Sequence, residues 1–110
     1  MTRKRGKSGR GKVNEARMRA RLEKEGYSVA RCVYPPGTFL PDHTHPFEKK
    51  DTVVSGQFRI KMHGQEFILG PGDGIRVPPG AKHSAEVVGT EPVVSLDGSK
   101  TIPPVPPKAR

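Results

Sequence analysis

Three of the four histidines in this 110-residue chain occur at spacings that allow them to bind one metal ion. His43 and His45 are separated by one residue, and His83 follows a later Pro-Pro-Gly segment. Because alternate side chains of a β-strand point to the same side, a strand through residues 43–45 would direct two imidazoles into one interior. His83, on a later strand, can supply a third ligand. Imidazole suits zinc, copper, iron and nickel, and three protein ligands leave a position open for substrate or water.

The fourth histidine, His63, is predicted to lie outside this site. It precedes Gly64 between two runs in which apolar and polar residues alternate. This pattern is typical of a β-hairpin, with the His-Gly pair at its tip. We therefore assign His63 to a turn and not to the metal site.

Glycine and proline residues accompany the histidines at regular spacings. They form two motifs that are separated by fifteen residues: Gly37, His43, His45 and Gly56 in the first, and Gly72, Pro78, Gly80 and His83 in the second. This pair of motifs resembles the two sequence motifs of the cupin family, over about residues 27 to 97. The resemblance implies a small antiparallel jelly-roll barrel that holds a metal ion or a small ligand in its interior.

Two positions depart from the family pattern. The pattern places a metal-binding glutamate four residues after the second histidine, where this chain has Lys49, and often an asparagine at the position of Val87. In a regular strand Glu48 faces away from the side of residue 49, whereas Asp51 shares that side, so either one becomes a fourth ligand only through a bulge or a register change. An inward Lys49 would repel a cation. The departures favour a plain three-histidine centre and leave open a site without metal.

The rest of the chain supplies the strands that would position these residues. In residues 57–62, apolar Phe58, Ile60 and Met62 alternate with polar side chains, which predicts a strand with one buried face. Similar runs between turns rich in Gly and Pro predict further strands at residues 28–34, 51–54, 65–69, 74–77, 83–88 and 92–96. With 32% hydrophobic residues, the chain has enough apolar side chains for one core. We predict an all-β fold, with a small antiparallel cupin barrel at residues 27–98.

The two ends differ from the middle of the chain. Residues 1–24 carry ten Lys or Arg against two Glu, whereas the remainder carries ten against nine acidic residues. Residues 1–13 are predicted to form a disordered basic tail, because they contain almost nothing apolar. Residues 14–26 are predicted to form a short helix that begins at Asn14 and rests on the barrel through Met18 and Leu22. The proline-rich residues 99–110 are predicted to form an extended tail.

The basic tail makes nucleic acid one candidate partner, since Lys and Arg neutralise phosphates. A solubilising role is favoured, because no aromatic residues are interspersed for base stacking and no helix is patterned for a groove. No apolar stretch follows the basic segment as in a secretion signal, and no run approaches membrane-spanning length. Cys32 is the single cysteine, so no internal disulfide can form, which predicts a cytoplasmic protein.

The sequence predicts a small cupin-domain protein that binds a divalent ion, iron, manganese, nickel or zinc, with Phe47 and Lys49 lining the pocket. Two functional classes stay open: a metal-dependent dioxygenase that acts on a small molecule, and a non-catalytic binding or sensing protein in which the metal is structural or absent. Hydrolysis by paired carboxylates is disfavoured, since no carboxylate has a matched partner in the sequence. Residues 27–34 are expected to be an edge strand through which a homodimer forms, and the alternative is a monomer whose helix covers that edge.

Overall fold

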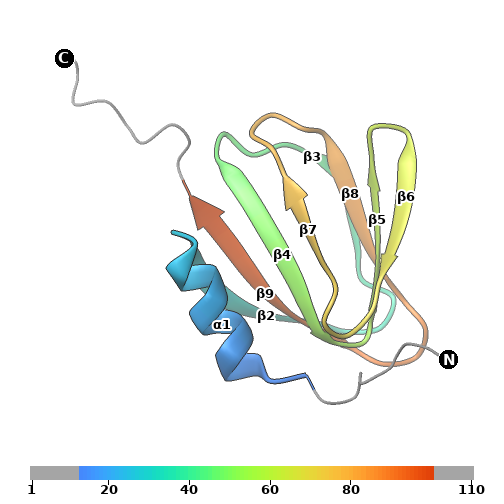
Figure 1. Cartoon of the computed structure of the whole chain (residues 1–110). Helices are drawn as coiled ribbons and strands as arrows, with labels where there is room; N and C mark the ends of the chain where they lie inside the picture. The colour runs from blue at the N-terminus through green and yellow to red at the C-terminus, as the bar shows by residue number, and fades with distance from the viewer. Residues whose placement is uncertain (1–12, 101–110) are drawn as a thin grey trace, which may run out of the picture.

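The computed structural model describes residues 13–100. Within them the chain forms one helix and eight strands: α1 (Glu15–Lys24), β2 (Ser28–Tyr34), β3 (Phe39–His43), β4 (Glu48–Ser55), β5 (Gln57–Met62), β6 (Gln65–Leu69), β7 (Gly74–Val77), β8 (His83–Val88) and β9 (Val93–Lys100). The strands form two antiparallel four-stranded sheets, with the orders β2-β9-β4-β7 and β3-β8-β5-β6. The sheets face each other, and α1 lies on the outer side of the β2-β9 region (Figure 1). The predicted all-β fold with one short N-terminal helix is confirmed.

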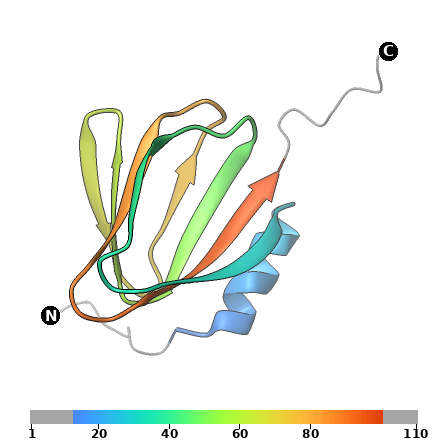
Figure 2. The same ribbon diagram turned by 180° about the vertical axis from the view of Figure 1, so that it is seen from behind.

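The alternation of apolar and polar residues along the strands explains the core between the sheets. The core consists of one buried face from each sheet: Val53, Phe58, Ile60, Leu69, Ala85, Val87 and Val93. A second, smaller cluster lies under the helix, where Leu22 packs on Tyr27 and Leu96, and Met18 adds a half-buried contact. The helix begins where the Asn14 side chain accepts a 2.9 Å hydrogen bond from the backbone of Arg17. The view from behind shows that α1 covers only the outer face of the β2-β9-β4-β7 sheet (Figure 2). The interior between the sheets is therefore lined by the strands.

Three strands differ from the sequence-based prediction. β4 begins at Glu48, three residues before the predicted start at residue 51. β3 was not among the predicted strands, and β9 continues to Lys100, so residues 99 and 100 belong to a strand and not to the predicted C-terminal tail. β9 lies between β2 and β4, where Ser99 pairs with both Ser28 and Lys49. Pairing on both sides therefore holds these polar residues in extended form. Residues 1–12 and 101–110, on which most of the predicted tails fall, lie outside the described residues.

Tight turns set the geometry of the strand connections. His63 and Gly64 both have positive φ angles, 56° and 74°, between β5 and β6, which confirms the predicted hairpin tip. Gly56 has a φ of +85°, and a Cβ atom at this position would lie 2.4 Å from the carbonyl oxygen of Pro92. Only glycine fits between β4 and β5 at this point. In residues 13–100, no helix has the length and apolar character that crossing a membrane requires.

Candidate metal centre

His43, His45 and His83, here called the histidine cluster, lie together. Their potential ligand atoms are within 4.8 Å of one another. The ring centroids of His43 and His83 are 4.2 Å apart, and that of His45 lies 4.9 Å from the first and 5.3 Å from the second. Two nitrogens that share one ion at about 2.1 Å are themselves separated by roughly 3 to 4 Å. The arrangement therefore suits one ion with small ring rotations.

His43 faces the interior because β3 contains a β-bulge. Leu40 pairs with Ala85 and His43 pairs with His83, so three residue steps on β3 match two on β8. Without the extra residue, alternation from Leu40, which packs against the core, would direct His43 outward. Pro41 lies within the bulge, where its missing N–H is tolerated because β3 is an edge strand. A local irregularity therefore aims the first imidazole into the sandwich.

His45 reaches the cluster from a loop and not from the strand that the sequence argument assumes. β3 ends at His43, and Pro46 lacks the N–H that a continued ladder would use. The carbonyl of His45 accepts a 2.8 Å hydrogen bond from the backbone N–H of Gly80, which lies in the turn before His83. This bond joins the two sequence motifs. The ring of His45 also stacks on Phe47, with centroids 5.5 Å apart.

Hydrogen bonds to the backbone prepare two of the imidazoles for metal binding. Nδ1 of His43 lies 2.7 Å from the carbonyl of Pro41, and Nδ1 of His83 lies 3.0 Å from that of Ala81. A carbonyl can only accept, so each Nδ1 carries a proton, which makes Nε2 the nitrogen that would bind the metal. Burial lowers the pKa of His83 and also that of His45, which the charge of Lys49 lowers further. Both shifts favour the neutral form of the ring, which is the form that binds metal.

Glu48 is turned away from the histidine cluster. Its carboxylate is buried, accepts a hydrogen bond from the hydroxyl of Tyr27, and receives two from Arg76 at 2.6 and 3.2 Å. These bonds, that of Arg76 first, hold the pKa of Glu48 at about 2. Tyr27 belongs to the cluster under α1, so Glu48 serves the outer face of the sheet. As a candidate fourth ligand it is in the wrong place, because alternation points it away from the interior.

Lys49 and Asp51 point between the sheets, as alternation predicts. They share a strand face with Val53, which is fully buried in the core. Nζ of Lys49 lies 3.7 Å from Oδ1 of Asp51, and the two side chains are only 14% and 15% exposed. Asp51 is not part of the group that contains the three histidines. It reaches Lys49 and, across the ladder, Asp97, which is its register partner in β9.

Asp51 is a register partner of Asp97, and this combination, here called the carboxylate pair, was missed by sequence reasoning, which named Asp51 alone. Asp97 accepts hydrogen bonds from the hydroxyls of Tyr34 at 3.0 Å and Ser95 at 2.5 Å. Burial, and then the charge of Asp97, raise the pKa of Asp51 to about 7. The expectation that no carboxylate has a matched partner is therefore wrong. Its cause is that only the register between β4 and β9 places these residues opposite each other.

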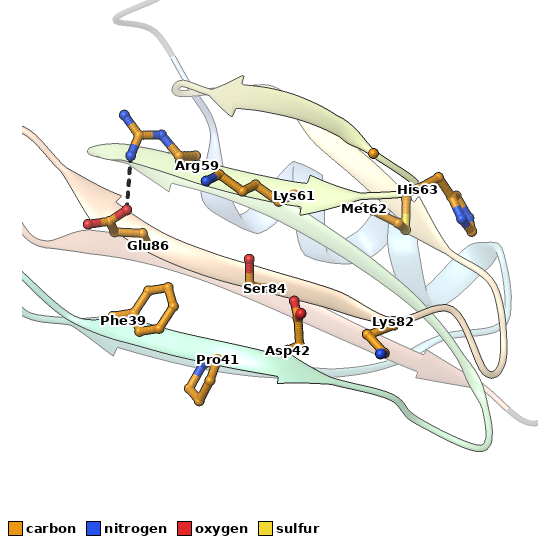
Figure 3. Close-up of a pocket in the computed structure, with 11 residues that line it drawn as sticks. Phe39, Pro41, Asp42, Arg59, Lys61, Met62, His63, Lys82, Ser84 and Glu86 are labelled. Carbon is orange, nitrogen blue, oxygen red and sulfur yellow. Dashed lines mark hydrogen bonds and ion pairs between the residues drawn. The ribbon is translucent and has the colours of Figure 1, made fainter.

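A cavity of about 820 Å³ lies elsewhere, on the β3-β8-β5-β6 sheet. Figure 3 shows its wall, with Phe39 on β3, Lys61 on β5 and the Arg59–Glu86 ion pair between β5 and β8. None of the three clustered histidines lines it, and neither do Phe47 and Lys49. This cavity is therefore not the pocket that the sequence predicts around Phe47 and Lys49.

Comparisons with known proteins agree with this architecture. A sequence model of the family described as "Cupin domain" matches residues 30–98. No curated protein sequence matches the chain. Among solved structures, the DMSP lyase DddQ from Ruegeria pomeroyi is similar, with a TM-score of 0.63 and 26% identity, covering 70% of this chain and 39% of that one. A cupin protein from Bacteroides fragilis has a TM-score of 0.63 and 25% identity, covering 71% and 68%.

A more distant similarity supports the fold alone. The cupin domain of Schizosaccharomyces pombe Cnp3 has a TM-score of 0.64 at 17% identity, covering 68% of this chain and 56% of that one. The chain thus spans about two fifths of the length of the DMSP lyase and little more than half of the Cnp3 domain. These proteins share the sandwich fold with this chain.

Proposed function

This chain belongs to the cupin family, and from that premise we propose that its histidine cluster binds one divalent metal ion and presents it to a small molecule. The observation that supports this most directly is the convergence of three imidazoles, two of which have Nδ1 occupied by a backbone carbonyl. Such bonds fix the tautomer and the ring orientation before the ion arrives. Histidines that serve only packing do not need to converge in this way with two of their rings fixed by the backbone.

The donor set restricts the ion to metals that accept nitrogen ligands. Iron, manganese, nickel and zinc are the candidates, because three imidazoles without a carboxylate suit transition metals better than magnesium or calcium. When bound, such an ion supplies a Lewis acid with open coordination positions and, in the case of iron, electrons for chemistry with dioxygen. Phe47, stacked on His45, forms an apolar wall beside the cluster.

We propose dioxygenase-like catalysis on a small molecule as the first candidate activity. The structural similarity to a protein named as a DMSP lyase supports a small-molecule substrate. That protein is much longer than this chain, so its reaction is not transferred here. The second candidate is a non-catalytic protein that binds or senses a small ligand, which is favoured by the absence of the clustered histidines from the lining of the 820 Å³ cavity.

Metal analysis of the chain purified without a histidine tag tests the proposal. Plasma mass spectrometry should find about one ion per chain in the wild type and a strong loss after His43→Ala, His45→Ala or His83→Ala. His63→Ala is the matched control, because this histidine lies at the hairpin tip outside the cluster. If the triple variant retains the wild-type stoichiometry, the metal site lies elsewhere.

A second measurement separates the two candidate activities. The iron-loaded protein is incubated with a panel of small organic acids and alcohols while oxygen consumption is followed with an electrode. Consumption that depends on one compound, and that is lost in the variants that lose metal, supports the enzyme. A folded protein that binds a compound without consuming oxygen supports the binding or sensing role.

A further inference from the structure

Lys49 places a positively charged side chain in the interior between the two sheets, where charged groups are rare. Its register partners are Val77 on β7 and Ser99 on β9. Val77 is 1% exposed and packs with Met62 and Ala81, near the turn that leads to His83. The Lys49 side chain is 14% exposed, whereas lysine normally extends its ammonium group fully into water. The place of Lys49 in β4 therefore encloses its side chain between the two sheets.

The ammonium group of Lys49 makes a long ion pair with a neighbouring carboxylate. The ion pair that the structure provides, to Oδ1 of Asp51, measures 3.7 Å, which is beyond hydrogen-bond distance. The same Oδ1 is buried and has no hydrogen-bond partner. Across the ladder, the negative charge of Asp97 adds to burial in raising the pKa of Asp51. Lys49, Asp51 and Asp97 thus lie together between the sheets, and Oδ1 of Asp51 has no hydrogen-bond partner among them.

Lys49 also lies close to the histidine cluster. Its register partner Val77 packs against Met62 and Ala81. Met62 is the register partner of His83, and the carbonyl of Ala81 accepts the hydrogen bond from Nδ1 of His83. A divalent ion at the cluster would place a second positive centre in the same enclosed space. Two positive charges in a medium of low dielectric constant repel each other strongly unless an anion lies between them. The family's glutamate supplies that negative charge, and this chain has none at the equivalent position.

We propose that the Lys49 ammonium and the metal ion at the histidine cluster together bind the carboxylate group of a small organic acid. This inference rests on the proposed metal binding and assigns it a class of ligand. A carboxylate has two oxygens and a single charge, so one oxygen can serve the ion and the other can accept a hydrogen bond from Nζ. A dianion such as phosphate is disfavoured, because the carboxylate pair lies beside Lys49 and would repel it.

Calorimetric titration of the zinc-loaded protein with sodium acetate tests the inference, with sodium chloride as the ionic-strength blank. Zinc suits three imidazoles and is redox-inert. Zinc content is measured first on every protein. Wild type should bind zinc and acetate, and Lys49→Gln should keep zinc while its acetate affinity falls at least about tenfold. Lys50→Gln is the matched control, since Lys50 lies on the opposite face and pairs with Glu25 at 2.8 Å.

Lys49→Glu provides a second readout, the zinc affinity, which does not depend on acetate. The substitution places a carboxylate at the position of the family's fourth ligand, so it should raise the zinc affinity. The same carboxylate should also abolish acetate binding. Unchanged zinc affinity in Lys49→Glu, or wild-type acetate affinity in Lys49→Gln, overturns the inference and leaves the proposed metal binding intact. A wild-type protein that takes up no zinc or other divalent ion overturns both.

Discussion

Replacement of Glu48 by glutamine tests whether this residue stabilises the fold or ligates metal. Its carboxylate is 2% exposed and receives hydrogen bonds from Tyr27 and, at two positions, from Arg76. Glutamine preserves the shape of the side chain but removes the charge and turns one acceptor into a donor. The donor then faces other donors. We expect a less stable protein that keeps its full metal content.

The magnitude follows from the contacts. Hydrogen bonds to charged groups contribute about 1.5 to 3 kcal/mol each. The Arg76 side chain is 62% exposed and regains water when the carboxylate is lost, so the net loss for Glu48→Gln should be about 1.5 to 3 kcal/mol in total and not per bond. In a domain of this size, 1 kcal/mol shifts Tm by about 4 to 8 °C. A decrease in Tm of roughly 10 °C is therefore expected.

The stabilisation that Glu48 contributes depends on pH, and the pKa of Glu48 gives the direction of this dependence. The pKa of Glu48 in the folded protein is about 2, below its ordinary value of 4.5. A depressed pKa means that the stabilisation is fully present above pH 4.5 and is lost as the pH falls toward 2. Urea unfolding at several pH values should show the difference between wild type and Glu48→Gln shrinking in that interval.

Glu86→Gln is the matched control for Glu48→Gln. Glu86 pairs with Arg59 at 2.9 Å, but its side chain is 39% exposed, so its loss should change stability by less than about 1 kcal/mol. Equal effects of the two substitutions would refute the assigned role of burial. A Glu48→Gln protein that is folded but has lost its metal would show instead that Glu48 is a ligand.

Three further predictions concern packing, the basic segment and assembly. Gly56→Ala should lower stability by about 2 to 4 kcal/mol in urea unfolding, whereas Gly89→Ala, with the same φ of +85° but no atom within 4 Å, should cost only about 1 kcal/mol; similar losses would contradict the clash with Pro92. Deletion of residues 1–12 should leave Tm within about 2 °C by calorimetry, because this segment offers no core residues; a larger drop would show that it packs on the domain. β2 is an edge strand whose Val33 is 54% exposed, so we expect a homodimer by light scattering behind a sizing column and its loss in Val33→Glu; a monomeric wild type would exclude it.

Much of the fold follows from the alternation of residue types. β5 repeats with period two, and its turn residues lie where the structure has positive φ angles, so its bounds are as predicted. β3 is not recognisable in the same way, because Pro41 and the bulge interrupt the period. The end of β9 resembles a turn in sequence, since Asp97 and Gly98 are typical turn residues. Its extended form depends on two neighbouring strands, which a local pattern does not contain.

Some features of the candidate site also follow from the sequence, whereas others depend on long-range strand pairing. The spacing of the three histidines predicts their convergence, because two short motifs carry it. The loop origin of His45 depends on where β3 ends, and the carboxylate pair depends on the register between β4 and β9. Both are consequences of long-range pairing. Alternation in the sequence places Asp51 on the interior side of its strand and Glu48 on the other, but their partners, Lys49 and Arg76, are known only from the folded chain.

Anomalous diffraction from crystals of the metal-loaded chain tests the central claim most directly. Data are collected on both sides of the absorption edge of the bound metal. We predict one anomalous peak at about 2.0 to 2.2 Å from a nitrogen of each of His43, His45 and His83. A peak bound by other residues, or no peak at the histidine cluster in crystals of protein that contains one ion per chain, would contradict it.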